Sequence, residues 1–206
     1  MQSVPESADI AVIKRILRAI GEPPTPVYRP SDDTFLMLDA ISDFSFKDKR
    51  TLDLGTGSGI LGLFAATQGA IVTLADVDEA AVRHAASAAQ SLGVEVNAVV
   101  SDLFQNVHAQ FDVILFNPPY LPSTATVDTA IDGGKQGTAL VDRFLRELPG
   151  KLKRDGTAFL LLSSLNDPSS LESKYDEFSF GLVRKRAFFF EELQVLRLRF
   201  RGISGQ

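Results

Sequence analysis

The sequence predicts an α/β domain with a mostly parallel sheet, helices on both faces and an antiparallel hairpin at its carboxyl end. Short apolar runs alternate with helical patterns from Arg50 onward, and parallel strands need such helical crossovers. A glycine-rich turn, 55–59, follows the first apolar run. The last two strand-like runs, 181–190 and 193–200, are separated only by Glu191-Glu192. That link is too short for a parallel connection.

Each element has its own signal in the chain. An apolar stripe at helical spacing predicts a helix over 8–20, which the prolines of 21–26 end. Ser31 or Asp32 can cap a second helix that runs through Ile41. Further patterns predict strands at 51–54, 71–75, 94–100, 111–116 and 157–162, and helices at 60–68, 79–92, 136–148 and 171–178. Without an internal repeat or linker we expect one domain over 1–206, with 1–26 as an amino-terminal helical extension.

Composition narrows the function classes. The 206 residues are 45% hydrophobic, enough for one core, and the formal net charge is -5. A nucleic-acid-binding surface is usually basic, so a protein or small-molecule substrate is favoured over nucleic acid. The basic clusters 151–154 and 184–186 are interpreted as solvated element ends.

The chain shows no membrane or metal signature. Its apolar runs are too short to cross a bilayer, and 1–8 lacks the basic start of a secretory signal. With no cysteine and two histidines, no zinc site is expected. The cytoplasm is therefore the expected compartment.

Glycines and acids follow successive predicted strands. The turn after the first strand contains Gly55, Thr56, Gly57 and Gly59, which allow a ligand to lie against bare backbone near a helix start. Asp76 ends the second strand, where an acid commonly binds ribose hydroxyls. Asp102 follows the third strand and can accept from an adenine amino group. Asp78 is better placed to cap the helix after it. Together these residues predict an adenosine site at the carboxyl edge of the sheet.

The segment Asn117-Pro118-Pro119-Tyr120 after the fourth strand is the most specific feature. Two prolines remove two N–H donors, so the Pro118 carbonyl can face a ligand, and the Asn117 side chain adds an acceptor. Tyr120 can stack on a flat substrate. These acceptors predict binding of a planar –NH2 group, which adenine and glutamine both offer.

Together these motifs resemble the class I, seven-stranded S-adenosylmethionine-dependent methyltransferases that modify amide or exocyclic amino nitrogens. More narrowly, the segments 27–35 and 132–137 resemble the HemK/PrmC group of protein-(glutamine-N5) methyltransferases. The resemblance spans roughly Tyr28 to Phe200. The short segment before Tyr28 resembles the archaeal and eukaryotic branch, which lacks the amino-terminal helical domain of the bacterial enzymes.

The resemblance implies a substrate, a partner and a set of site residues. The substrate would be the glutamine of the Gly-Gly-Gln motif of a translation termination factor. The partner would be a small zinc-binding activator protein that covers apolar surface beside the cofactor. Asn117, Pro118, Pro119 and Tyr120 would hold the substrate. The cofactor would lie against Tyr28, Thr34, Asp53, Gly55, Thr56, Gly57, Gly59, Asp76, Val77, Asp102, Leu103 and Asn117, with its methionine end toward Asp53 and the segment 28–33.

Three alternatives remain open from the residues alone. An adenine-N6 methyltransferase acting on RNA or DNA would use the same acceptors on a flipped or unpaired base. A protein-lysine methyltransferase would need a deprotonated ammonium. A non-catalytic cofactor-binding scaffold would have no need for the intact loop 117–120.

Overall fold

The computed structural model describes residues 10–119, 133–188 and 191–202. The helices are α1 Ile10–Ile20, α2 Asp32–Ile41, α3 Ile60–Thr67, α4 Glu79–Leu92, α5 Gly133–Glu147 and α6 Pro168–Lys174, with 3-10 turns at Leu148–Gly150 and Ser164–Asn166. The strands are β1 Arg50–Leu54, β2 Ile71–Asp76, β3 Val96–Val100, β4 Phe111–Phe116, β5 Leu152–Ser163, β6 Phe178–Ala187 and β7 Glu192–Phe200.

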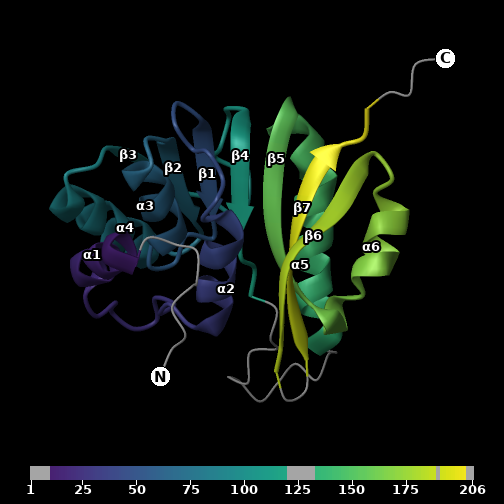
Figure 1. The fold of residues 1–206 in the computed structure, drawn as a ribbon, viewed down its shortest axis with the longest axis horizontal. Helices are drawn as coiled ribbons and strands as arrows, with labels where there is room; N and C mark the ends of the chain where they lie inside the picture. Colours follow the sequence, from purple (N-terminus) through teal and green to yellow (C-terminus); the bar gives the residue numbers. More distant parts are fainter. Residues whose placement is uncertain (1–9, 120–132, 189–190, 203–206) are drawn as a thin grey trace.

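The strands form one sheet in the order β3-β2-β1-β4-β5-β7-β6. Strands β1 to β5 run parallel, whereas β7 pairs antiparallel with both β5 and β6. Strand β3 lies at one edge and β6 at the other (Figure 1). The predicted parallel sheet with an antiparallel terminal hairpin is therefore confirmed, and the chain has the class I methyltransferase fold.

Two apolar clusters cover the two faces of the sheet. One joins α1, α2, α3 and α4 to inward residues such as Val113 and Leu115. The other joins α5, α6 and the loop after β3 to Ile114 and Phe116. Neighbouring residues of β4 thus point to opposite faces, and both faces are buried. This explains why β4 reads as a nearly continuous apolar run rather than an alternating one.

Several element boundaries differ from those expected, most of all the start of β5. Strand β5 begins at Leu152 instead of residue 157, because Phe111 of β4 pairs with Leu152 before a register shift. Helix α6 begins at Pro168, since the Asp167 side chain caps it by accepting from the Ser170 N–H. Strand β6 accordingly starts at Phe178.

Helix α1 packs onto α3 and α4 through Ile13, Ile16 and Ile20, which are buried in the same cluster. Arg15 Nη2 also donates to the Leu92 carbonyl at 2.8 Å. Among the helices described, none is long and apolar enough to cross a membrane.

Candidate active site

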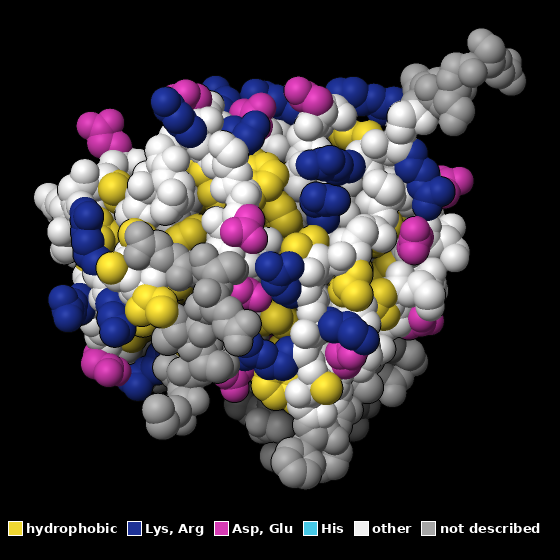
Figure 2. Space-filling view, in the orientation of Figure 1, with side chains coloured by type: hydrophobic (Ala, Val, Ile, Leu, Met, Phe, Trp, Pro, Cys, Tyr) yellow, Lys and Arg dark blue, Asp and Glu magenta, His cyan; other side chains and the backbone are white. Residues whose placement is uncertain are grey.

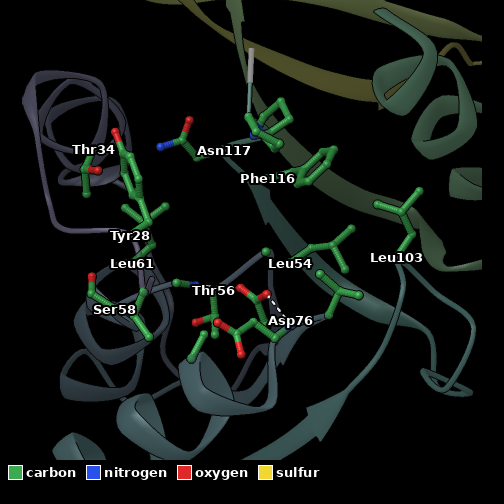
Figure 3. A pocket seen from close by; sticks show the side chains of 18 of the residues that line it. Tyr28, Thr34, Leu54, Thr56, Ser58, Leu61, Asp76, Leu103, Phe116 and Asn117 are labelled. Carbon is green, nitrogen blue, oxygen red and sulfur yellow. Dashed lines mark hydrogen bonds between the residues drawn. The ribbon is translucent and has the colours of Figure 1, made fainter. Parts of the chain in front are cut away.

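The loops after β1, β2, β3 and β4 meet the start of α2 around a pocket of about 420 Å³ (Figure 3). Small-molecule sites usually occupy roughly 300–1,000 Å³. Twelve of the residues predicted for the site line this pocket: Tyr28, Thr34, Gly55, Thr56, Gly57, Asp76, Val77, Asp102, Leu103, Asn117, Pro118 and Pro119. Asp53 and Gly59 do not line it, and Tyr120 lies outside the described residues.

The glycine turn is shaped by backbone that only glycine adopts readily. Gly55, Gly57 and Gly59 have φ values of 64°, 51° and 88°, in the left-handed region. A Cβ on Gly57 would lie 3.4 Å from the Tyr28 Cβ, so Tyr28 closes over the turn. Gly59 begins α3 and packs against α4, behind the pocket wall.

Asp53 supports the turn from beneath. Its side chain is 1% exposed, and its Oδ2 accepts from Thr56 Oγ1 at 2.6 Å and from the Gly62 N–H at 2.9 Å. Burial raises the pKa of Asp53 from 3.8 to about 7, although both hydrogen bonds oppose the rise and the nearby Asp76 charge adds to it. Asp53 therefore orders the turn that forms the pocket floor.

The raised pKa of Asp53 predicts a pH-dependent stability. The folded protein keeps a proton that the unfolded chain releases between about pH 4 and pH 7. The free energy of unfolding therefore falls as the pH rises through this window, by at most about 1.4 kcal/mol per pH unit from this group. The side chain of the Asp53→Asn variant cannot ionise. We therefore expect its free energy of unfolding to fall less over the same pH range. Thermal denaturation at about pH 5 and about pH 8 compares the two proteins. Equal pH dependence of their Tm values would contradict the assignment.

Asp76 is held at the end of β2 by two backbone donors. Its Oδ2 accepts from the Gly57 N–H at 2.9 Å and its Oδ1 from the Asp78 N–H at 3.0 Å. The carboxylate is thus fixed beside the glycine turn with lone pairs left for ribose hydroxyls. Asp78 caps α4 by accepting from the Ala80 N–H at 2.8 Å, as its position after the strand suggested.

Replacing Asp76 by Ala should weaken binding of S-adenosylmethionine roughly ten- to hundredfold, as expected when hydrogen bonds to a charged group are lost. Asp78→Ala is the matched control, since it removes a neighbouring carboxylate that caps a helix. Isothermal titration calorimetry measures both affinities. A similar loss in the two variants would mean that the ribose role does not belong to Asp76.

The loop after β3 is fixed by side chains. Ser101 Oγ donates to the Leu103 carbonyl at 2.8 Å and accepts from the Asn106 N–H at 2.9 Å. Leu103 has φ 47° and lines the pocket with its neighbour Asp102. One oxygen of Asp102 pairs with Arg143 of α5 at 3.0 Å, which leaves its other oxygen for an adenine amino group.

Asn117 extends from the end of β4 toward the start of α2. Its Nδ2 donates to Asp33 Oδ2 at 2.8 Å, and in Figure 3 it lies on the same side of the pocket as Tyr28 and Thr34. Its Oδ1 is buried and has no hydrogen-bond partner among the described residues. Buried acceptors are normally paired, so this oxygen is available to a donor on a ligand.

Burial and the Asp33 carboxylate raise the pKa of Tyr28 to about 12, against the effect of a hydrogen bond with Ser31. The Tyr28 hydroxyl therefore stays protonated and lies 2.8 and 2.9 Å from the two Asp33 oxygens.

Asp33 itself was not among the predicted site residues. Its place in the segment 28–34, beside Tyr28 and Thr34, was the available signal. Leu54, Phe116 and Leu140 also line the pocket, although they are not among the predicted site residues.

The pocket fits S-adenosylmethionine in shape and in chemistry. Asp76 can bind ribose hydroxyls, while Val77, Leu103 and Leu54 give the apolar surfaces that an adenine ring needs. Glycine backbone at positions 55 and 57 allows close approach of the ligand. The fold and site define a class I S-adenosylmethionine-dependent methyltransferase.

Comparison with known proteins gives the family. Residues 32–180 match the family model described as methyltransferase small domain, and the chain belongs to this family. It is 37% identical over 179 residues to a putative protein N5-glutamine methyltransferase from Methanocaldococcus jannaschii, covering 82% of this chain and 90% of that protein. It is also 35% identical over 132 residues to ribosomal RNA small subunit methyltransferase C of Chromohalobacter salexigens, covering 64% of this chain and 37% of that protein.

A solved structure has a similar fold. The structure of the E. cuniculi Mtq2-Trm112 complex, responsible for methylation of the eRF1 translation termination factor, matches with a TM-score of 0.66 and 24% identity. The match covers 84% of this chain and 98% of the matched chain. The chain is thus a methyltransferase that uses S-adenosylmethionine.

Proposed function

We propose that this enzyme methylates the side-chain amide nitrogen of the glutamine in the Gly-Gly-Gln motif of a translation release factor. The observation that carries the proposal concerns Asn117. Its buried Oδ1 has no hydrogen-bond partner among the described residues, and its Nδ2 donates to Asp33. A primary amide offers two N–H donors, which Asn117 Oδ1 and the Pro118 carbonyl can accept. The names of the M. jannaschii relative and of the Mtq2-Trm112 complex support this substrate.

The chain contributes positioning rather than acid–base chemistry. Bound S-adenosylmethionine supplies a methyl group on a positively charged sulfur. An amide nitrogen is a poor nucleophile because its lone pair is delocalised into the carbonyl. Fixing both N–H bonds favours a pyramidal nitrogen, and orientation alone can supply several kcal/mol. The methylated nitrogen then releases one proton to solvent, so that no general base is required.

The placement of basic residues counts against a nucleic-acid substrate. Figure 2 shows Lys and Arg side chains along the upper edge of the molecule, where β4 and β5 begin in Figure 1. The cluster 151–154 opens β5, whereas Leu160 of β5 pairs with Phe116 beside Asn117. The strand between Lys153 and Leu160 spans roughly 20 Å. This cluster is thus far from the pocket, and Lys153 pairs with Asp112.

The second basic cluster is balanced by acids. Arg184 pairs with Asp39 and Lys185 with Glu192, at 2.9 and 3.0 Å, and Arg186 lies 4.0 Å from Asp32. Such partners reduce the charge that could hold a phosphate backbone. These ion pairs link β6 to α2 and to β7, whereas the sequence predicted only a solvated end of an element.

An activator subunit belongs to the same proposal. Val77 and Val100 are exposed by 71% and 41%. Val100 ends β3, which is an edge strand, and it pairs with Asp76, the residue before Val77. Val77 also lines the pocket, so this apolar surface adjoins the cofactor site. Exposed apolar side chains beside an open strand edge favour a protein partner. The small zinc-binding activator that the family resemblance implies would fit this description, and the Mtq2 chain of the matched structure is in complex with Trm112.

A radiolabelled methyl-transfer assay tests the substrate class. A translation release factor, RNA and histone are each incubated with the enzyme, with and without a Trm112-type activator. We expect label on the release factor and its loss when the glutamine of the Gly-Gly-Gln motif is replaced. Label on RNA or histone alone would assign one of the other methyltransferase activities. No label under any condition would favour a cofactor-binding scaffold.

A further inference from the structure

Asp33 is a buried carboxylate surrounded by neutral donors. Its side chain is 3% exposed, near the start of α2. Ser31 Oγ donates to its Oδ1 at 2.5 Å and Thr34 Oγ1 lies 3.3 Å from the same oxygen. The Tyr28 hydroxyl and Asn117 Nδ2 complete the set at 2.8 Å each. Four side chains, one of them 84 residues away in sequence, therefore converge on one carboxylate.

No cation balances this charge in the part of the chain that the structure describes. The ion pairs of α2 are made by Asp32, with Arg186, and by Asp39, with Arg184. A buried carboxylate held by neutral donors is costly, and the local hydroxyls of Tyr28, Ser31 and Thr34 already give this one three contacts. The additional contact to Asn117 across the pocket needs a separate reason.

The carboxylate determines which end of the Asn117 amide faces the pocket. A carboxylate accepts hydrogen bonds and donates none, so the atom turned toward Asp33 must be Nδ2. The amide is planar, and Oδ1 therefore points away from Asp33. This oxygen is the buried atom without a partner among the described residues. If the amide turned over, it would offer a donor to the substrate and its oxygen would face the carboxylate.

We propose that Asp33 is a positioning residue for methyl transfer: it fixes the Asn117 amide so that its oxygen faces the acceptor nitrogen. This inference rests on the proposed function, in which Asn117 Oδ1 receives an N–H of the substrate amide. It also defines the substrate class more narrowly. The oriented side chain accepts an N–H donor and rejects a substrate that offers only a carbonyl at this point.

The variant Asp33→Asn tests the inference because it keeps the size of the side chain. The amide that the variant carries at position 33 can either accept from Asn117 Nδ2 or donate to Asn117 Oδ1. The orientation of the Asn117 amide is therefore no longer fixed. Asp32→Asn is the matched control. It makes the same charge change one residue away, on a side chain that is 52% exposed, whereas Asn117 Nδ2 donates to Asp33.

Three readouts are compared in the full-length enzyme with its activator. Steady-state transfer to the release factor should show a kcat about 100-fold lower in Asp33→Asn, as expected when a reacting group is misplaced. Affinity for S-adenosylmethionine, measured by calorimetry, should change less than about threefold. Asp32→Asn should match the wild type in both measurements.

In an Asn117→Ala background, Asp33→Asn should cause little further loss of kcat, since the effects of residues that act as a unit are not additive.

The third readout does not depend on activity. The side-chain amide resonance of Asn117, identified by its absence in Asn117→Ala, should shift in Asp33→Asn and stay unchanged in Asp32→Asn. An unchanged resonance with wild-type kcat would overturn the inference. So would an equal loss of kcat and cofactor affinity, because Asp33 would then build the cofactor pocket. If the wild type methylates no release factor, the proposed function fails, and the Asn117 resonance alone decides the role of Asp33.

Discussion

Replacing Asn117 by Ala is expected to reduce methyl transfer by a factor of about 100 to 1,000 while S-adenosylmethionine binds with nearly wild-type affinity. The variant removes Oδ1, which has no partner in the described part of the chain and which we assign to the substrate amide. Asp33 keeps its donors Tyr28, Ser31 and Thr34, so the start of α2 should remain folded. The loss should therefore appear in kcat, because the acceptor amide is no longer oriented.

Asn117→Asp is the informative companion. It has nearly the same shape but places a second carboxylate where Nδ2 now lies 2.8 Å from Asp33. Two carboxylates so close repel each other or share a proton, so the oxygen facing the substrate is no longer a fixed acceptor. We expect activity well below wild type in this variant too. Single-turnover rates and calorimetry measure transfer and cofactor affinity separately. If both variants lose affinity and rate by the same factor, Asn117 acts on the cofactor instead.

Gly59→Ala should produce the largest loss of stability, about 2–5 kcal/mol, from a strained backbone and a steric clash together. Gly59 has φ 88° at the start of α3. A Cβ there would lie 2.7 Å from the Ala85 Cβ and 3.2 Å from the Ala85 Cα. Relief of this clash with Ala85 would require α3 and α4 to move apart, and that movement would also disturb the glycine turn. In thermal denaturation the Tm should fall by roughly 5–15 °C.

Two further variants separate strain from clash. Gly93 has φ 70° at the carboxyl end of α4, and a Cβ there meets nothing within 4 Å. Gly93→Ala should therefore show the strain alone, about 1–2 kcal/mol. The double variant Gly59→Ala with Ala85→Gly removes the clashing methyl and should regain part of the loss. Equal Tm values for Gly59→Ala and Gly93→Ala would show that the packing of α3 on α4 is not tight at this point.

Much of the fold followed from local patterns. The parallel strands are mostly apolar, and the carboxyl ends of β2, β3 and β4 are marked by Asp76, by 101–103 and by Asn117. Parallel strands place these ends along one edge, so the pocket could be located before any tertiary contact was known. The two-residue link Glu191-Glu192 predicted an antiparallel hairpin, and β6 and β7 pair antiparallel as expected.

The contacts between distant segments could not be predicted. Asp33 and Asn117 are 84 residues apart, and nothing in either local sequence specifies their hydrogen bond. Likewise, Asp53 was expected near the methionine end of the cofactor, but its carboxylate is directed to Thr56 and Gly62. The hydrogen bond from the Gly62 N–H to Asp53 depends on how closely α3 packs on β1. Contacts of this kind are determined by three-dimensional packing rather than by residue type.

Tandem mass spectrometry of a release factor co-expressed with this enzyme and a Trm112-type activator tests the central claim most directly. The account predicts one added methyl group on the side chain of the glutamine in the Gly-Gly-Gln motif. The methyl group should be absent when the wild-type enzyme is replaced by Asn117→Ala. An unmodified glutamine in the presence of active, cofactor-binding enzyme, or a methyl group found only on lysine or on RNA, would contradict it.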